Sequence, residues 1–542
     1  MTDNEQRSKL QTRLPLLLAA TLAAGMFIGQ KLPHYDRNFS LGSRTSATAG
    51  TLDEILRYVE AKYVDTVDIE KLRATAIDHL LDGLDPHSVY ISPDELQAVE
   101  DDMNGEFEGV GIEFLILDDT IQVVAPLSGG PSEMAGILAG DKIVSINDTV
   151  IAGIKVETGK IYNRLRGPKG SKVKVGILRG HETKLRYFEV SRDVIPLKSV
   201  EAAYMLNENT GYIKIAHFNS NTYQEFMQKF TPLAEEKGMQ SLVLDLRGNP
   251  GGYLEEATEI LSQFFPGDKL LVYTQGRAGQ RKEYKSNGRA RFDIQNIAVL
   301  IDEGSASASE IVAGAIQDWD RGWVVGRRSF GKGLVQEQYP LSDGGAMRLT
   351  VSRYFTPSGR CIQRDYKNGK DYDHETERRL KNGELTNAEK IQQADTTKYY
   401  TGQGRIVFGG GGITPDVFIP IDTSFSSAYF TALRQKIPQF MSRWMEGRDQ
   451  AAISSGLAEF ARTYTVSDEM LEELATYAEK QGTKKSTVEL AKSRAELKLQ
   501  LKARLAKTLY GDEGLYKILN DDDPAVEKAV QVLKRGQPVA KR

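Results

Sequence analysis

Three short segments of the 542-residue sequence contain residue types that could catalyse a reaction. In the first, Ser305, Ser307 and Ser309 alternate with alanine directly after a turn at residues 302–304. A serine at the N-terminus of a helix lies among free backbone N–H groups and the positive end of the helix dipole, which favour an alkoxide or an oxyanion. Serine is also a preferred N-cap residue, so the run alone leaves a catalytic and a purely structural interpretation open.

The second segment surrounds Lys332, which has a glycine on either side. If residues 332–338 form a strand, we expect Lys332, Leu334 and Gln336 to share one face. Burial lowers the pKa of a lysine and allows the amine to act as a general base. A charged lysine in a surface loop is the simpler alternative.

Two motif matches overlap this segment and point to other chemistry. Residues 326–332 fit the GxxxxGK pattern of a phosphate-binding loop, but Gly333 replaces the Ser or Thr that would hold magnesium, and a strand pattern follows. Ser329 and Lys332 fit SxxK, which requires a helical turn that Phe-Gly-Lys-Gly disfavours. A nucleotide-binding protein is therefore only a weaker alternative.

The third segment, residues 247–252, follows an apolar stretch at residues 241–246 and ends in Gly251 and Gly252. Successive glycines after a parallel strand allow the backbone to approach a ligand closely. The N–H groups of these glycines could complete an oxyanion hole. The alternative is a strand-to-helix turn that binds nothing.

Composition excludes several other kinds of site. Cys361 is the only cysteine, which excludes an intramolecular disulfide, a Cys-rich zinc site and a CxxC pair. The six histidines include no i, i+4 pair, so a helical HExxH zinc site is also excluded. A formal charge of −4 gives no reason to expect nucleic-acid binding. We therefore expect no metal and no organic cofactor, and chemistry that depends on Ser, Lys, Asp, Glu or backbone groups.

The N-terminal residues 1–50 have the pattern of a membrane address. Three basic residues precede seventeen uncharged ones at residues 14–30, as in a signal peptide or an uncleaved signal anchor. No small-x-small cleavage site follows the apolar run, which favours the anchor. We predict a cytoplasmic tip, an anchor and a tether here, with the remaining chain extracytoplasmic, on the periplasmic face of a bacterial inner membrane.

The remaining chain shows a change of periodicity along its length, which predicts a multidomain protein with an α/β core and a small β domain. Helical spacing is followed by short strands with Gly-rich turns, then by strands that alternate with helices, and finally by helices. The predicted segments are 51–104 (helical), 105–192 (small β domain), 193–420 (α/β core, with a polar insertion near 366–403) and 421–542 (helical).

The small β domain opens with Gly109, Val110, Gly111 and Ile112 ahead of an apolar strand. Tight glycines expose backbone N–H groups that can hold a carboxylate, and the strand edge can pair with an extended peptide. Together with the small-residue and turn pattern of residues 135–148, the segment resembles a PDZ domain. That resemblance implies recognition of a free C-terminal carboxylate, whereas a β domain that only packs is the alternative.

Arg166 lies in the Leu-Arg-Gly-Pro-Lys-Gly stretch of this domain. A charge in such a turn is usually solvated. We also consider that Arg166 contacts the catalytic domain and couples peptide binding to activity.

Taken together, the motifs resemble those of the carboxy-terminal processing proteases, also called tail-specific proteases. The resemblance covers about residues 51–420. The motifs are LDLRGNPGG at 244–252, GSASASE at 304–310, SFGKGLVQ at 329–336, LTVSRYFTPSG at 349–359 and GITPD at 412–416.

This resemblance implies a serine endopeptidase with a Ser–Lys dyad that cleaves proteins near their C-termini. Motif matching places the nucleophile at Ser307, the base at Lys332, the assisting glutamine at Gln336, and the oxyanion hole at Gly251 or Gly252 with Ala308. Ser305, Ser309 and Asp318 are structural in this alignment. The expected partners are protein substrates with free C-termini.

A binding protein without catalytic activity is the alternative to a protease. A catalytically inactive PDZ scaffold or adaptor at the membrane would use the same β domain without the serine. The helical region after residue 420 could also bind an adaptor or a second copy of the chain.

Overall fold

The computed structural model describes residues 50–155, 158–180, 182–277, 279–288, 290–366, 372, 374–446, 448, 453 and 456–538. The chain divides into two compact units, residues 1–76 and 77–542. The predicted anchor at residues 14–30 lies outside the described residues. Within the described ranges, no helix combines the length and the apolar character needed to cross a membrane.

Helices lead into the second unit, as the sequence pattern predicts. They are α2 (Thr51–Lys62), α3 (Ile69–Asp82) and α4 (Pro93–Asn104), with the short strand β1 (Val89–Ile91) before α4. Pro93 begins α4 at the position where the missing N–H of proline costs nothing. Gly105 ends α4 with a φ of 72°, a left-handed conformation that glycine adopts without strain.

The small β domain forms one sheet with strand order β3-β4-β5-β7-β8, and β6 pairs with β5. The sheet and helix α6 enclose an aliphatic core that includes Ile121, Ile143, Ile161 and Val175. The elements are β2 (Glu106–Gly109), β3 (Ile112–Leu117), β4 (Thr120–Pro126), α5 (Pro131–Met134), β5 (Lys142–Ile146), β6 (Thr149–Val150), α6 (Thr158–Leu165), β7 (Lys172–Leu178), β8 (Arg186–Ser191) and β9 (Asp193–Pro196).

The α/β core is built on a six-stranded sheet with the order β10-β11-β12-β15-β16-β21. The five strands from β11 to β21 are parallel, and β10 pairs antiparallel with β11. This confirms the predicted α/β class. The strands are β10 (Val200–Met205), β11 (Thr210–Ile215), β12 (Ser241–Asp245), β15 (Asn296–Ile301), β16 (Trp323–Gly326) and β21 (Val417–Phe418).

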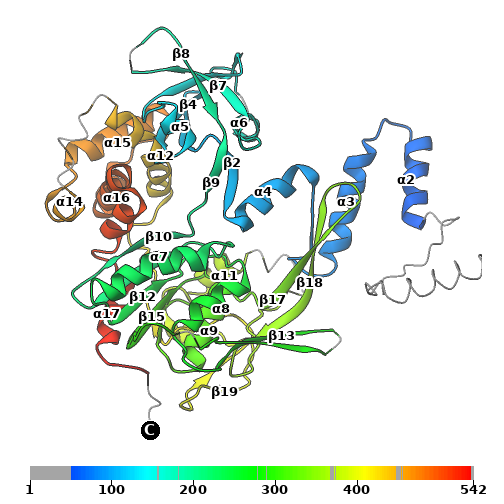
Figure 1. Cartoon of the computed structure of the whole chain (residues 1–542), viewed down its shortest axis with the longest axis vertical. Coiled ribbons are helices and arrows are strands. Elements are labelled where there is room, and N and C mark those ends of the chain that lie inside the picture. The colour runs from blue at the N-terminus through cyan, green and yellow to red at the C-terminus, as the bar shows by residue number, and fades with distance from the viewer. Residues whose placement is uncertain are drawn as a thin grey trace, which may run out of the picture. The chain divides into compact units, whose positions relative to one another are not determined.

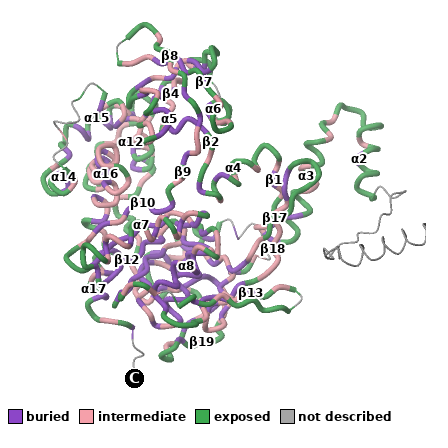
Figure 2. Tube along the Cα trace, viewed as in Figure 1, coloured by how far each residue is buried: buried purple, intermediate pink, exposed green. Residues whose placement is uncertain are grey.

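Both faces of this sheet are covered by helices (Figure 1). Side chains alternate along a strand, so Leu242 and Leu244 face one layer while Val243 faces the other. The first layer contains α7 (Thr222–Glu235), α8 (Leu254–Ser262) and α9 (Ala308–Asp318), and the second contains α17 (Pro524–Leu533). The strands beneath α8 form a continuous buried region in Figure 2.

A second sheet of five strands has the order β1-β18-β13-β14, with β17 paired to β18. Its strands are β13 (Leu270–Gly276), β14 (Arg281–Lys285), β17 (Leu334–Pro340) and β18 (Ala346–Phe355). The predicted insertion near 366–403 contains helix α11 (Glu375–Lys381) and the 3-10 turn η1 (Ala388–Lys390), and β19 (Tyr399–Tyr400) pairs with β20 (Ile406–Val407).

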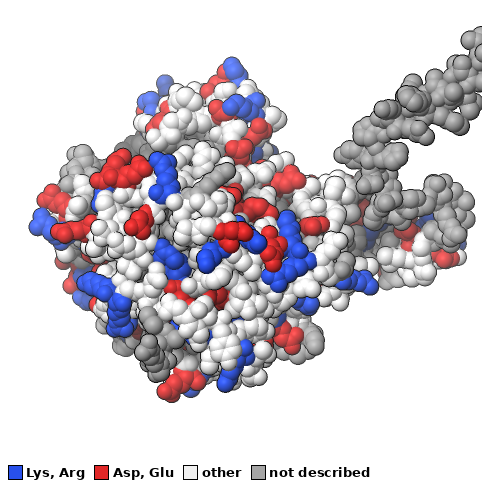
Figure 3. All heavy atoms as spheres, turned by 60° about the horizontal axis from the view of Figure 1, so that its bottom comes forward, with Lys and Arg blue, Asp and Glu red and all other residues white. Residues whose placement is uncertain are grey.

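The described C-terminal part is mainly helical. The helices are α12 (Ala428–Met445), α14 (Leu457–Thr463), α15 (Asp468–Lys480), α16 (Thr487–Leu519) and α17. The first four share a core of their own, whereas α17 packs on the α/β sheet. Acidic and basic side chains are interspersed on the face drawn in Figure 3, in keeping with the small net charge.

Candidate active site

Ser307 lies at the turn from β15 into α9, as the N-cap residue of that helix. Its φ of 53° and ψ of −114° are a strained backbone conformation for a residue with a side chain, of the kind that clusters at active sites. The neighbouring serines are buried and donate to backbone carbonyls, Ser305 to Leu246 at 2.8 Å and Ser309 to Asn249 at 3.0 Å. Ser307 is the half-exposed member of the run.

A buried carboxylate joins the segment of Ser307 to the segment of Lys332. Glu310 Oε2 accepts from the backbone N–H of Ser307 at 2.9 Å and from that of Lys332 at 2.8 Å. Its Oε1 accepts from the N–H of Gly331 at 2.7 Å and from Ser329 Oγ at 2.5 Å. One side chain therefore fixes the backbone on both sides of the proposed dyad.

Tyr354 holds the same two residues from their carbonyl side. Its hydroxyl lies 2.6 Å from the carbonyl oxygen of Lys332 and 3.1 Å from that of Ser307. The side chain is buried on β18, and burial raises the pKa of Tyr354 well above its ordinary value. The phenol therefore stays protonated, and its O–H is the hydrogen-bond donor to these carbonyl oxygens.

The loop around Lys332 differs from the sequence-based expectation. Strand β17 begins at Leu334, two residues after Lys332, and its register shifts between Val335 and Gln336. The expected strand at residues 332–338 is therefore wrong at its start, because Lys332 lies in the loop before β17 and not on a strand face with Leu334 and Gln336. The extra residue of the bulge, Val351, belongs to β18, so the alternation of side chains along β17 is unchanged.

The ammonium group of Lys332 is partly withdrawn from solvent. Burial lowers the pKa of Lys332, and the positive charge of Arg348 lowers it further, while Glu310 and Asp85 oppose the shift. A lysine in such surroundings loses its proton more readily than one in water. The expectation of a partly buried lysine thus holds against that of a solvated loop residue.

Gln336 belongs to a polar chain that reaches the turn before β1. Its Nε2 donates to Thr350 Oγ1 at 3.3 Å, and Thr350 Oγ1 donates to Asp85 Oδ1 at 3.0 Å. Asp85 also accepts from Ser88 Oγ at 2.6 Å. Sequence reasoning gave Asp85 no role in the site, because its partner Thr350 lies far away in the sequence.

His87, in the same turn, was also missed. Desolvation and then the charge of Lys332 lower its pKa to about 4, which keeps the imidazole neutral. Its Nε2 lies 2.7 Å from the hydroxyl of Tyr372. Nothing in the sequence around His87 indicates that this histidine lies close enough to Lys332 to sense its charge.

Gly251 packs directly against the serine. It has a φ of 101°, and a Cβ at this position would lie 2.6 Å from Ser307 Cβ. The N–H of Gly251 already donates to Asn249 Oδ1 at 2.8 Å. A glycine is thus required for the loop to approach Ser307 this closely. The Gly251 N–H itself is already hydrogen-bonded within the loop, to Asn249.

Unlike the N–H of Gly251, those of Gly252 and Ala308 have no hydrogen-bond acceptor among the described residues. Phe218 forms a bridge with Gly252 and leaves no room for a side chain there, since a Cβ would lie 1.9 Å from the carbonyl oxygen of Phe218.

The insertion supports the loop that carries Lys332. Arg379 donates to the carbonyl oxygens of Arg328 at 2.5 Å and of Ser329 at 3.1 Å, and all of these groups are buried. Glu384 accepts from Arg328 Nε at 2.7 Å and from Arg379 Nε at 2.8 Å. Glu384 thus pairs with both guanidinium groups, and such pairing with hydrogen bonds is what allows buried charges to be tolerated.

The glycine turn of the small β domain lies at an open edge. Strand β3, which starts at Ile112, pairs with β4 and is the terminal strand of the sheet. The carbonyl of Val110 accepts from Ser132 Oγ at 2.6 Å, and that of Gly111 accepts from the Leu127 N–H at 2.9 Å. Gly109 pairs with β9. The turn is therefore held by hydrogen bonds within the domain, and in the described part of the chain β3 pairs with β4 alone.

Arg166 contacts the helical segment rather than the α/β core. Its Nη1 donates to Asp101 Oδ2 on α4 at 2.7 Å, and its guanidinium lies 4.8 Å from the centre of the Phe107 ring. The side chain is therefore not a solvated turn charge.

Among the described residues, no group of three or more His, Cys, Asp or Glu could hold a metal ion.

Comparison with known families and proteins agrees with this geometry. Residues 209–376 match the model of peptidase family S41, and residues 109–190 match the PDZ domain. Residues 429–511 match a family of unknown function, DUF8443.

The chain is 35% identical over 352 residues to the carboxy-terminal processing protease CtpB of Bacillus subtilis, covering 63% of this chain and 72% of that protein. It is 36% identical over 356 residues to a carboxy-terminal-processing protease of Bartonella bacilliformis, covering 63% and 79%. The chain belongs to the carboxy-terminal processing proteases. The predicted family, fold class and serine protease class are thereby confirmed.

Solved structures similar to this protease include the photosystem II D1 C-terminal processing protease. The two share 28% sequence identity with a TM-score of 0.35, over 69% of this chain and 94% of that one.

We predict that Glu310 makes the stability of the protease depend on pH. Burial raises the pKa of Glu310 from 4.5 to about 7. Its contribution to stability is therefore fully present below pH 4.5 and is lost as the pH rises through 7. Relative to a Glu310→Gln variant, which cannot titrate, the wild type should lose about 3 kcal/mol between pH 4.5 and pH 8. Urea unfolding of both proteins across this range measures the difference, and parallel pH profiles would contradict the prediction.

Proposed function

We propose that the protease hydrolyses peptide bonds with Ser307 as nucleophile and Lys332 as general base. The observation that carries this proposal is the Glu310 carboxylate, which binds the backbone N–H groups of both residues. A buried clamp of this kind keeps two segments from different parts of the chain in register. The lowered pKa of Lys332 provides the neutral amine that a base requires.

The reaction follows from these roles. Lys332 takes the proton of the Ser307 hydroxyl while Ser307 Oγ attacks the carbonyl carbon of the peptide bond. The Gly252 and Ala308 N–H groups stabilise the resulting oxyanion, and Gly251 provides the close approach. The Lys332 ammonium then protonates the leaving amine, and water hydrolyses the acyl-enzyme. Gln336 supports the lysine loop from β17 through its bond to Thr350.

The inactive PDZ scaffold is not favoured, because the chain belongs to a protease family and keeps the serine and the lysine at its motif positions.

We predict that Ser307→Ala and Lys332→Arg each lower kcat by at least about a thousandfold while the protein stays folded. Arginine keeps the positive charge but cannot give up its proton, so this variant separates a general base from a structural cation. The assay is cleavage of an unfolded, C-terminally tagged protein, with the new N-termini identified by sequencing. Ser342→Ala, at an exposed position, is the matched control.

Full activity of Ser307→Ala would contradict the nucleophile assignment. Substantial activity of Lys332→Arg would contradict the role of the lysine as base.

We also propose that the PDZ domain binds the C-terminal tail of the substrate. The edge of β3 can accept an extended chain, and the backbone N–H groups of the turn from Gly109 to Ile112 would hold the terminal carboxylate. Helix α6 lies beside this strand, since the rings of Phe114 and Tyr162 are 5.3 Å apart. Peptide binding would reach the rest of the unit through the Arg166–Asp101 pair.

We predict that amidation of the substrate's C-terminus weakens its binding about tenfold or more, because the charged acceptor for the turn N–H groups is lost. The dissociation constants of the free-acid and amide peptides should be measured on Ser307→Ala, which binds without cleaving. Equal affinities would contradict tail recognition by its carboxylate.

We also propose roles for the two terminal parts of the chain. Residues 1–50 would anchor the protease at the periplasmic face of a bacterial inner membrane, because a basic flank precedes an apolar run. The C-terminal helices α12 to α16 would offer a surface to an adaptor protein or to a second copy of the chain.

A further inference from the structure

Helix α17, the last helix among the described residues, packs on the sheet of the α/β core. Ala525, Val526, Ala529, Val532 and Leu533 of α17 are buried against the α/β sheet. This helix lies outside the S41 match, which ends at residue 376, and outside the DUF8443 match, which ends at residue 511. Neither family model thus covers the helix that completes the second layer.

Asp523, the N-cap residue of α17, uses its two carboxylate oxygens for different tasks. Oδ1 accepts from the N–H groups of Ala525 at 2.7 Å and Val526 at 3.3 Å, which caps the helix. Oδ2 accepts from Arg247 Nη1 at 2.6 Å. The second bond links the C-terminal helix to a residue at the end of β12.

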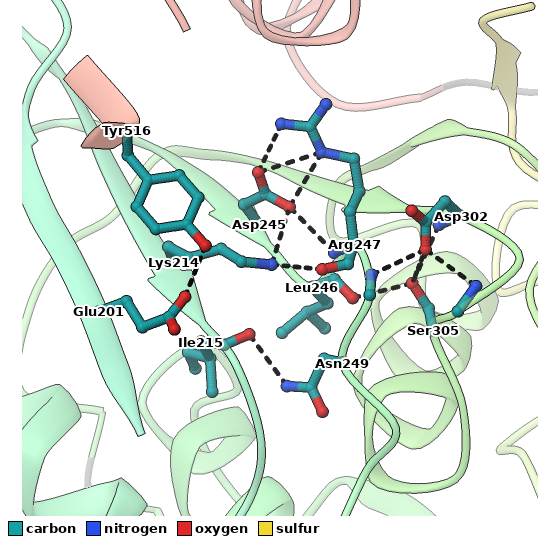
Figure 4. Close-up of polar contacts among 12 residues, drawn as sticks. Glu201, Lys214, Ile215, Asp245, Leu246, Arg247, Asn249, Asp302, Ser305 and Tyr516 are labelled. Carbon is teal, nitrogen blue, oxygen red and sulfur yellow. Dashed lines mark hydrogen bonds and ion pairs between the residues drawn. The ribbon is translucent and has the colours of Figure 1, made fainter. Parts of the chain in front are cut away.

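Arg247 is held between this carboxylate and a buried one. Its Nε and Nη2 donate to Asp245, with the shortest contact at 2.6 Å, while Lys214 Nζ donates to the Arg247 carbonyl oxygen. Figure 4 shows Lys214, Asp245 and Arg247 converging above the loop. Two cations and two anions balance in this cluster, and Asp523 is the anion that comes from the C-terminal helix.

The loop that carries the Gly252 N–H, one of the two proposed oxyanion donors, starts at the next residue. The Gly248 N–H donates to Asp302 Oδ1 at 2.8 Å, and Ser305 Oγ donates to the Leu246 carbonyl at 2.8 Å (Figure 4). Asn249 Nδ2 donates to the Ile215 carbonyl at 3.0 Å. The loop is thus fixed to its neighbours on the sheet, and Arg247, the residue directly before it, is linked to α17 through Asp523.

We propose that Asp523 is a positioning residue. Through its bond to Arg247, it holds the loop at residues 248–252 and so positions the N–H of Gly252. The role rests on the proposed function, since it assigns Asp523 to the placement of an oxyanion donor. The alternative is that Asp523 only caps α17.

Two substitutions separate the cap from the ion pair. Asp523→Ser keeps a good N-cap and removes the partner of Arg247, whereas Asp523→Glu keeps a carboxylate within reach of Arg247 and weakens the cap. The exposed neighbour Asp522 provides the control Asp522→Ser, which removes the same charge.

Three quantities should be measured for each variant: kcat and KM for the tagged substrate, thermal stability, and amide hydrogen exchange of residues 248–252 and of α17. We expect Asp523→Ser to lower kcat about tenfold with KM changed less than twofold, because an oxyanion donor acts in the transition state. Its loop amides should exchange faster while α17 keeps its protection. Asp523→Glu should retain more activity than Asp523→Ser although it is the less stable protein.

A wild-type kcat and wild-type loop exchange in Asp523→Ser would overturn the proposal. Activity that follows stability, so that Asp523→Glu is the poorer enzyme, would overturn it in favour of the cap. If the wild type does not cleave peptides, the proposed function fails, and the exchange of residues 248–252 still decides whether Asp523 positions the loop.

Discussion

The geometry of the active site depends on one buried carboxylate. Glu310 is the third residue of α9, and it accepts hydrogen bonds from the serine turn behind it and from the lysine loop beyond β16. Each segment alone is a strained or glycine-rich turn that could adopt several conformations. The carboxylate selects one of them for both, at the cost of burying a group whose pKa is raised to about 7.

The surrounding fold brings the donors to that carboxylate. Parallel strands end at the same edge of the sheet, so the turns after β12 and β15 meet there, with Gly251 against Ser307. The second sheet contributes Tyr354, and the insertion supports the lysine loop with buried ion pairs. The helix α17 covers the opposite face and reaches the start of the glycine loop through Asp523.

Local patterns predicted the class of the fold and the segments of the site, because strand alternation and helix caps depend on neighbouring residues. The motifs placed Ser307 at a helix N-terminus, where the structure has it. The start of β17 was predicted two residues too early, since the spacing of Lys332, Leu334 and Gln336 does not show where pairing with β18 begins. The bonds of Glu310 and Asp523 could not be predicted, because each joins segments that only the tertiary fold brings together.

Glu310 holds the proposed nucleophile, Ser307, and the proposed base, Lys332, in register. The most direct test is kcat for the tagged substrate, measured for Glu310→Gln beside the wild type, with circular dichroism as the check on folding. Glutamine has nearly the same shape, but its amide would direct N–H groups at backbone donors. We expect kcat to fall at least about a hundredfold with KM nearly unchanged. A folded Glu310→Gln protein with wild-type kcat would contradict it.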